Sequence, residues 1–112
     1  ATMCGWGAHL QDVYQRRADV LNRGMSGYNT DWYLRHLSDT HNKYDQMSNV
    51  KLVIIFFGAN DSASATLNPR QHVPTTRFVA NLKKLVELAR EYFGASVKVL
   101  LVGAPPVDHE KR

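Results

Sequence analysis

The segment 51–57, Lys-Leu-Val-Ile-Ile-Phe-Phe, is the feature that most constrains the fold of this chain. All of its residues except the lysine are apolar, and most of these are β-branched or aromatic. A continuous apolar run of this kind is typical of a strand buried on both faces, as in a parallel sheet flanked by helices. Ligands of such sheets bind just beyond the carboxyl ends of the strands. The residues that follow, 58–62, are therefore candidates for a functional site.

Three other segments are predicted to be helices: 5–17, about 30–37, and 75–93. The first and the third have apolar residues three and four positions apart, and the second contains aromatic residues that would pack on a sheet. Thr30 is expected to cap the second helix, and the threonines at 75 and 76 the third. Gly94 is expected to end the third helix as its C-cap.

Strands are predicted at 18–23, 51–57 and 96–102, each preceded by one of the helices. Such alternation predicts an α/β fold of three αβα layers, in which helices cover both faces of a parallel sheet. Three strands are few for a sheet of this class. The segment 1–112 is therefore expected to be one partial domain that is incomplete at both ends.

Composition narrows the classes of function. The chain has 112 residues, 44% of them hydrophobic and 21% charged, which fits one folded domain. Its net charge is +4, but lysine and arginine are scattered, so no nucleic-acid partner is expected. No apolar run could span a bilayer, and the first residues lack the pattern of a signal peptide. The lone cysteine, Cys4, excludes an internal disulfide and fits a reducing compartment, so a cytoplasmic location is expected.

Two loops, 24–29 and 58–62, are expected side by side at the carboxyl edge of the sheet. Gly27 offers an unhindered backbone N–H, and Asn60 offers a side-chain amide. Two such donors could bind the oxyanion that develops in acyl transfer, and one donor typically lowers the barrier by about 2.7–4 kcal/mol. Taken alone, the local sequence favours the alternative that Asn60 and Asp61 are ordinary turn residues, which are common after strands.

The segments 22–30 (Asn-Arg-Gly-Met-Ser-Gly-Tyr-Asn-Thr) and 56–63 (Phe-Phe-Gly-Ala-Asn-Asp-Ser-Ala) resemble two motif blocks of the SGNH, or GDSL-type, hydrolases. The isoamyl acetate-hydrolysing esterases are the most similar subgroup. The segments 5–8, 68–74 and 102–108 resemble further parts of the family, so the resemblance extends in order over essentially the whole chain. It implies a flavodoxin-like sheet and hydrolysis of a small carboxylic ester through an acyl-serine intermediate, with no metal or organic cofactor.

The resemblance also implies roles for individual residues. The Gly27 N–H and the Asn60 carboxamide would bind the oxyanion, and Asp61 would brace its loop by hydrogen bonds. Tyr28 and His72 are candidate substrate-binding residues, the alternative for His72 being a solvated loop histidine. The family's Gly-Asp-Ser nucleophile motif and its Asp-x-x-His pair have no counterpart in the sequence.

The loop serines Ser26, Ser62 and Ser64 have no histidine and carboxylate at a spacing that indicates a triad, and the histidines are too spread for a metal site. The isolated chain is therefore expected to lack serine-dependent esterase activity. The alternative is a non-catalytic binding or regulatory module derived from the same fold. Such a module would form a homo-oligomer, or pair with a related chain, through the sheet edge left by the family's missing first strand.

Overall fold

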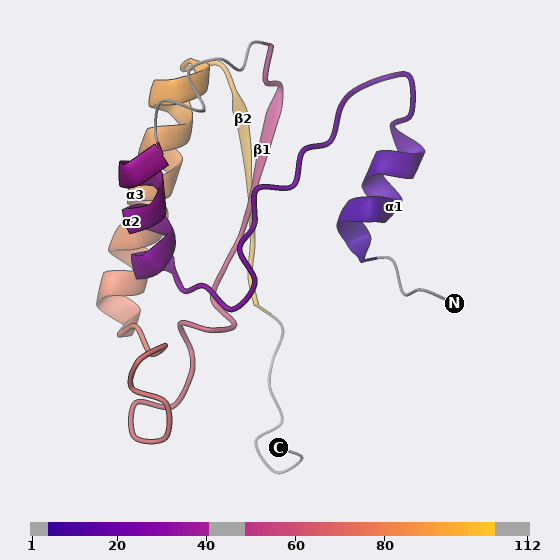
Figure 1. The fold of residues 1–112 in the computed structure, drawn as a ribbon. Coiled ribbons are helices and arrows are strands. Elements are labelled where there is room, and N and C mark those ends of the chain that lie inside the picture. The colour runs from indigo at the N-terminus through magenta and orange to yellow at the C-terminus, as the bar shows by residue number, and fades with distance from the viewer. Residues whose placement is uncertain (1–4, 41–48, 105–112) are drawn as a thin grey trace.

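The computed structural model describes residues 5–40 and 49–104 (Figure 1). Its elements, in chain order, are α1 (Trp6–Val13), α2 (Thr30–Thr40), β1 (Leu52–Phe56), α3 (Thr75–Phe93) and β2 (Lys98–Val102). Both later strands and the long third helix lie where the sequence predicts them. Cys4, the histidines at 41 and 109, and the end of the 102–108 segment lie outside the described residues.

The two strands form a parallel sheet in which Leu52 pairs with Lys98 and Phe56 pairs with Val102. Parallel neighbours need a crossover connection, and α3 provides it. All residues of β1 are apolar, as are those of β2 after Lys98, and both strands contain β-branched residues, which fit a pleated, half-buried surface. The predicted α/β class is confirmed as helices around a small parallel sheet.

The core lies between this sheet and the pair of helices α2 and α3. Its buried centre consists of Leu37 from α2, Ile55 from β1 and Leu85 from α3. Val53 and Val99, on the same face of the sheet as Ile55, pack against this centre. The apolar stripe predicted on α3 is the surface that faces the sheet, because members of it are buried or packed in this cluster.

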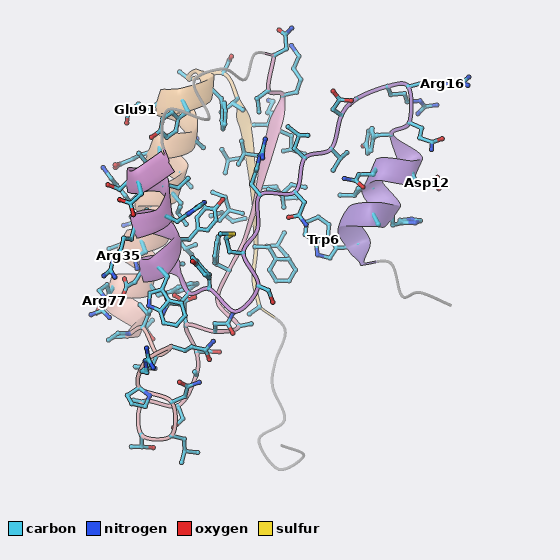
Figure 2. All side chains as sticks on the ribbon, in the orientation of Figure 1. Trp6, Asp12, Arg16, Arg35, Arg77 and Glu91 are labelled. Carbon is cyan, nitrogen blue, oxygen red and sulfur yellow. The ribbon has the colours of Figure 1, made fainter. Side chains whose placement is uncertain are left out.

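The opposite face of the sheet is thinly covered. Figure 1 shows α1 on this side, away from α2 and α3, and Figure 2 shows Trp6 extending from α1 toward the sheet. The Trp6 and Phe56 rings lie 6.2 Å apart, but no residue of α1 is buried. Leu52 and Leu100 are about half exposed, at 50% and 48%. The third layer of the predicted αβα arrangement is therefore incomplete.

The prediction of a strand at 18–23 is wrong, because these residues form neither a helix nor a strand. Apolar residues form a strand only where a neighbour accepts and donates hydrogen bonds, and within the described residues the sheet consists of β1 and β2 alone. The segment is held instead by side chains: Gln11 donates to the Val20 carbonyl at 2.9 Å, and the Tyr33 hydroxyl donates to the Arg23 carbonyl at 2.9 Å.

Two helix caps also differ from the prediction. The side chain that caps α2 belongs to Asn29, whose Oδ1 accepts a hydrogen bond from the Trp32 N–H at 2.8 Å. Thr30 is fully buried and uses its hydroxyl elsewhere, and α2 runs beyond Leu37 to Thr40. The residue before α3 is Pro74, with no side-chain cap, so the threonines do not cap α3. Gly94 does end α3, at a φ of 99°.

Candidate functional site

The carboxyl end of β1 leads into a tight turn, 58–61, here called the Asn60 turn. Gly58 begins it with a φ of 129°, a conformation that favours glycine. A Cβ at Gly58 would lie 3.2 Å from the Phe78 ring and 3.4 Å from the Ala104 side chain. The backbone angle therefore favours glycine, and a Cβ here would also need the Phe78 ring to move by a few tenths of an ångström.

A second turn, 25–28, precedes α2 and is called the Gly27 turn. It is closed by a hydrogen bond from the Tyr28 N–H to the Met25 carbonyl at 3.2 Å. Gly27 has a φ of 80°, and the space around its Cα is open. Within the described part of the chain, the Gly27 N–H has no hydrogen-bond acceptor. This exposed glycine therefore presents a free backbone donor, as the sequence predicts.

The two turns are in direct contact. The Asn60 side-chain nitrogen donates to the Tyr28 carbonyl at 3.1 Å. The Nε2 of Gln71 donates to the Gly27 carbonyl at 2.9 Å and to the Asn60 Oδ1 at 3.3 Å. A carboxamide nitrogen carries two hydrogens, and among the described residues the Tyr28 carbonyl is the one acceptor of the Asn60 nitrogen. One N–H of Asn60 and that of Gly27 thus remain available on adjoining turns.

A buried network of hydrogen bonds supports the contact between the two turns. Asp61 is 3% exposed, and its Oδ2 accepts hydrogen bonds from both the N–H and the hydroxyl of Thr30. Asn81 of α3 in turn donates to the Thr30 hydroxyl oxygen at 2.9 Å and to Asp31 at 2.7 Å. The bracing role expected of Asp61 is therefore confirmed, and it joins the Asn60 turn to the first residue of α2.

An ion pair extends this network to the surface. Arg77 of α3, labelled in Figure 2, contacts the Asp31 carboxylate at 2.9 Å. Asp31 lies in the first turn of α2, where a negative charge is favourable next to the free N–H groups of the helix. The amino-terminal ends of α2 and α3 are consequently fixed to each other beside the two turns.

Tyr28 and His72 lie near these turns, and their substrate-binding roles stay predictions. The Tyr28 ring packs edge-on against Trp32 and His36, at centroid distances of 5.8 and 6.5 Å. His72 Nδ1 lies 2.7 Å from the Ala63 carbonyl. Because a carbonyl only accepts, Nδ1 carries the proton in this contact, and the ring is held to its own loop.

Three polar residues of the site, Gln71, Asn29 and Asn81, are not among those predicted from the sequence. Asn29 could have been found, since asparagine is at least as good an N-cap as the threonine that follows it. Gln71 lies in the 68–74 segment, which resembles the family, but no local pattern indicates that its side chain reaches back to Gly27. Asn81 lies three residues after Phe78 and four before Leu85, both in the apolar stripe of α3, so its spacing could have indicated that it is buried, but not that it bonds to Thr30.

Among the described residues, the arrangement provides hydrogen-bond donors for an anion but no serine paired with a base. The hydroxyl of Ser62 donates to the Ala59 carbonyl at 3.0 Å, that of Ser64 bonds to Thr66 at 3.0 Å, and that of Ser26 has no partner there, so none of the three loop serines is paired with a histidine. In residues 5–40 and 49–104, no three His, Cys, Asp or Glu side chains are grouped as metal ligands, and no helix is both long and apolar enough to span a bilayer.

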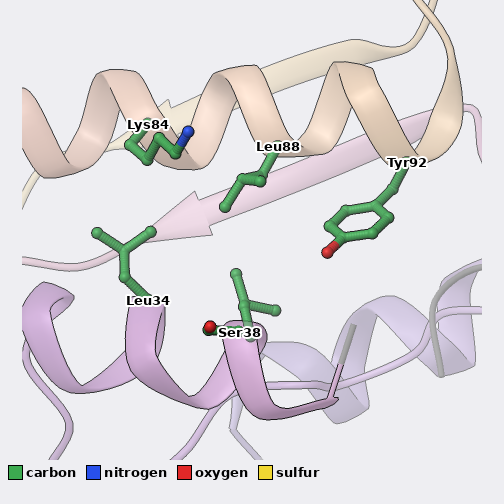
Figure 3. Close-up of a pocket in the computed structure, with 6 residues that line it drawn as sticks. Leu34, Ser38, Lys84, Leu88 and Tyr92 are labelled. Atoms are coloured by element: carbon green, nitrogen blue, oxygen red, sulfur yellow. The ribbon is translucent and has the colours of Figure 1, made fainter. Parts of the chain in front are cut away.

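A hollow lies elsewhere, between α2 and α3 (Figure 3). Its volume is about 540 Å³. It is lined mainly by apolar side chains from the middle and the later turns of both helices, namely Leu34, Leu37, Ser38, Lys84, Leu88 and Tyr92. None of the predicted site residues borders it, so the candidate site is the pair of turns.

The GDSL-like lipase/acylhydrolase family model matches residues 1–112. The isoamyl acetate-hydrolyzing esterase 1 homolog of Bos taurus is 46% identical over 103 residues, and that of Homo sapiens is 43% identical over 103 residues. Each alignment covers 92% of this chain and, respectively, 41% and 42% of the relative. A GDSL esterase/lipase of Arabidopsis thaliana is 39% identical over 111 residues, and the alignment covers 96% of this chain and 44% of that relative.

No solved structure matches the chain. The chain spans about two fifths of the length of the curated relatives that it matches. The family match nevertheless extends over every residue, including both turns that form the candidate site. This chain belongs to the GDSL-like lipase/acylhydrolase family.

Proposed function

We propose that this chain supplies the oxyanion-binding part of a hydrolase acting on small carboxylic esters. The observation that supports the proposal is the contact between the two turns, in which Gln71 bonds to both Gly27 and Asn60. Each turn retains an N–H donor that could face one oxygen atom. The names of the mammalian relatives refer to isoamyl acetate, an ester of the proposed size class.

The proposed chemistry is acyl transfer through a serine ester. When a serine oxygen adds to the ester carbonyl, the carbonyl oxygen becomes an oxyanion. The Gly27 N–H and the free N–H of Asn60 would donate to that oxygen more strongly than to the neutral carbonyl, and this difference lowers the barrier. The serine and the histidine–aspartate pair would come from parts of the whole protein outside these 112 residues, since the chain spans 41% of such relatives.

The first test is hydrolysis of p-nitrophenyl acetate by the full-length protein. Replacing Asn60 with alanine is expected to lower kcat by about 10²–10³-fold, the usual effect of losing one oxyanion donor. Gln15→Ala is the matched control, because it removes an exposed carboxamide from the turn that follows α1, away from the Gly27 and Asn60 turns. Equal activity of the Asn60→Ala and wild-type enzymes would contradict the proposal.

The isolated 112-residue chain is expected to show no turnover above the uncatalysed rate. Residual hydrolysis that survives Asn60→Ala, together with replacement of the loop serines 26, 62 and 64, would show that the chemistry does not use these groups. That result would remove the basis for assigning the chain an oxyanion-binding role.

A second candidate function is a non-catalytic binding module that forms a homo-oligomer or pairs with a related chain. It is favoured by the exposed apolar side chains on the thinly covered face of the sheet, including Leu52, Phe56 and Leu100. The free edge of β1 could also accept another strand. Size-exclusion chromatography with light scattering distinguishes the candidates: a stable dimer without hydrolysis in the full-length protein favours the module, and an active monomer favours the enzyme.

A further inference from the structure

We propose that Gln71 is a positioning residue of the oxyanion site, whose task is to fix which end of the Asn60 carboxamide faces the substrate. The inference rests on the proposed function, because it concerns how one of the two oxyanion donors is oriented. It follows from the hydrogen bonds that join Gln71, Asn60 and Tyr28.

A carboxamide has an acceptor end and a donor end of nearly the same shape, so a rotation by 180° about its last bond exchanges them. In the observed orientation, the Asn60 oxygen accepts from Gln71 Nε2 at 3.3 Å, and the Asn60 nitrogen donates to the Tyr28 carbonyl at 3.1 Å. Rotation would place the Asn60 nitrogen against the Gln71 nitrogen, and the Asn60 oxygen against the Tyr28 oxygen. Both contacts would then be repulsive.

This orientation matters because an oxyanion needs a donor. With its oxygen bound to Gln71, the Asn60 nitrogen keeps one N–H for the substrate beyond the one used on Tyr28. If the group rotated, a lone pair would replace that N–H and would repel the developing negative charge. The Tyr28 carbonyl and Gln71 together exclude the rotated state, and Gln71 is the partner that mutation can remove.

Gln71 is itself oriented by its neighbours. Its Oε1 accepts a hydrogen bond from the Asn68 side chain at 2.7 Å, which leaves Nε2 pointing toward the two turns. Its backbone carbonyl accepts from the Asn29 side chain at 2.9 Å. The carboxamides of Asn68, Gln71 and Asn60 therefore form a chain in which each donates to the next, and the Tyr28 carbonyl ends it. Hydrogen bonds arranged head to tail polarise one another in the same direction.

The second hydrogen of Gln71 Nε2 serves the other donor. It bonds to the Gly27 carbonyl at 2.9 Å and so holds the turn in which Gly27 has its φ of 80°. One side-chain nitrogen thus links the residues that provide both proposed donors. Gln71 makes this link although it follows Gly27 by 44 positions in the sequence.

The test uses steady-state hydrolysis of p-nitrophenyl acetate by the full-length protein in a double-mutant cycle. Gln71→Met keeps the length and approximate volume of the side chain but removes both donors. It is expected to lower kcat at least tenfold, up to the about 10²–10³-fold loss typical of a missing oxyanion donor, and to change KM less than twofold. Arg70→Met is the control, because Arg70 is the exposed neighbour of Gln71, and its kcat is expected to stay at the wild-type value.

The decisive comparison is made in the Asn60→Ala background. If Gln71 acts mainly through Asn60, adding Gln71→Met there is expected to lower kcat by a clearly smaller factor than in the protein that retains Asn60, because no carboxamide is left to orient and only the bond to the Gly27 carbonyl is lost. An equal loss in both backgrounds would overturn the inference while leaving the proposed function intact. An Asn60→Ala enzyme with wild-type kcat would instead overturn the proposed function itself.

Gln71→Glu provides a second variant if the methionine protein does not fold. The glutamate oxygens accept but do not donate, so the side chain would repel the Asn60 oxygen and the Gly27 carbonyl while keeping the acceptor for Asn68. The kcat is again expected to fall at least tenfold when Gln71→Glu is made in the wild-type protein, and much less when it is made in the Asn60→Ala protein. Wild-type kcat in Gln71→Glu would contradict the positioning role.

Discussion

The buried carboxylate of Asp61 accepts hydrogen bonds from both the backbone N–H and the hydroxyl of Thr30, which lies 31 positions earlier in the chain. Thr30 is the first residue of α2, and Asp61 ends the Asn60 turn. The same pair therefore fixes the start of a helix and the turn that bears a proposed oxyanion donor. The other carboxylate oxygen of Asp61, Oδ1, is buried with no hydrogen-bond partner in the described part of the chain.

The first prediction concerns this carboxylate. Asp61→Asn is expected to lower the free energy of unfolding by about 1.5–3 kcal/mol, because hydrogen bonds to a charged acceptor become neutral ones and a buried amide lacks a second partner. Asp12→Asn is the matched control, since Asp12 is exposed on α1 (Figure 2), and it should change stability by less than about 0.5 kcal/mol. Urea denaturation measures both; equal midpoints for the two variants would show that the network contributes little.

The glycines of the two turns are expected to respond differently to alanine. Gly58→Ala combines an unfavourable φ with a Cβ that lies 3.2 Å from Phe78, so we expect a loss of about 2–4 kcal/mol. Gly27→Ala has the unfavourable φ but open space, and should lose about 1–2 kcal/mol. Gly7→Ala, inside α1, is the control and should be neutral or stabilising.

Thermal denaturation with circular dichroism would rank these three variants. The expected order of stability is Gly7→Ala, then Gly27→Ala, then Gly58→Ala. A Gly58→Ala protein as stable as the Gly7→Ala protein would mean that the close packing after β1 is not as described.

The core prediction contrasts two leucines. Leu85 of α3 is 5% exposed at the centre of the core, so Leu85→Ala should destabilise the protein by about 2–5 kcal/mol. Leu67, in the loop before Gln71, is 88% exposed, and Leu67→Ala should change stability by less than about 0.5 kcal/mol. Similar denaturation midpoints for the two variants would contradict the assignment of the core.

Amide hydrogen exchange tests the absence of the first predicted strand. The amides of β1 that pair with β2 should be protected, because they are hydrogen-bonded in the sheet. Those of 20–22 should exchange rapidly, since no strand neighbours them in the described chain and Leu21 is 60% exposed. Strong protection of 20–22 in this chain would show that this segment pairs with β1 or another partner after all.

The long helix α3 and the two strands were predictable because local signals decide them. The apolar stripe of α3 repeats over 19 residues, and Gly94 ends it with a left-handed φ. Tertiary partners decide the remaining features. The choice of Asn29 over Thr30 as the cap of α2 depends on Asp61, which claims the Thr30 hydroxyl. Asp61 lies 31 positions after Thr30, so the sequence around the start of α2 does not indicate this hydrogen bond.

The candidate site was predictable only where a local sequence motif indicates it. Gly27 and Asn60 follow from motifs that resemble the family, and the structure brings their turns into contact. Gln71 could not be inferred from its neighbours, because its role depends on a hydrogen bond across 44 positions. The segment 18–23 has the composition of a strand, but composition cannot supply the neighbouring strand that it would need.

A crystal structure of the full-length protein inactivated with an organophosphate would show whether both proposed donors face one oxygen. The reagent places a phosphoryl oxygen where the oxyanion would form. We predict that the Gly27 nitrogen and the Asn60 Nδ2 will both lie about 2.7–3.1 Å from that oxygen, with the Asn60 oxygen still bonded to Gln71. A phosphoryl oxygen bound by other donors, with either nitrogen out of hydrogen-bond range, would contradict the account.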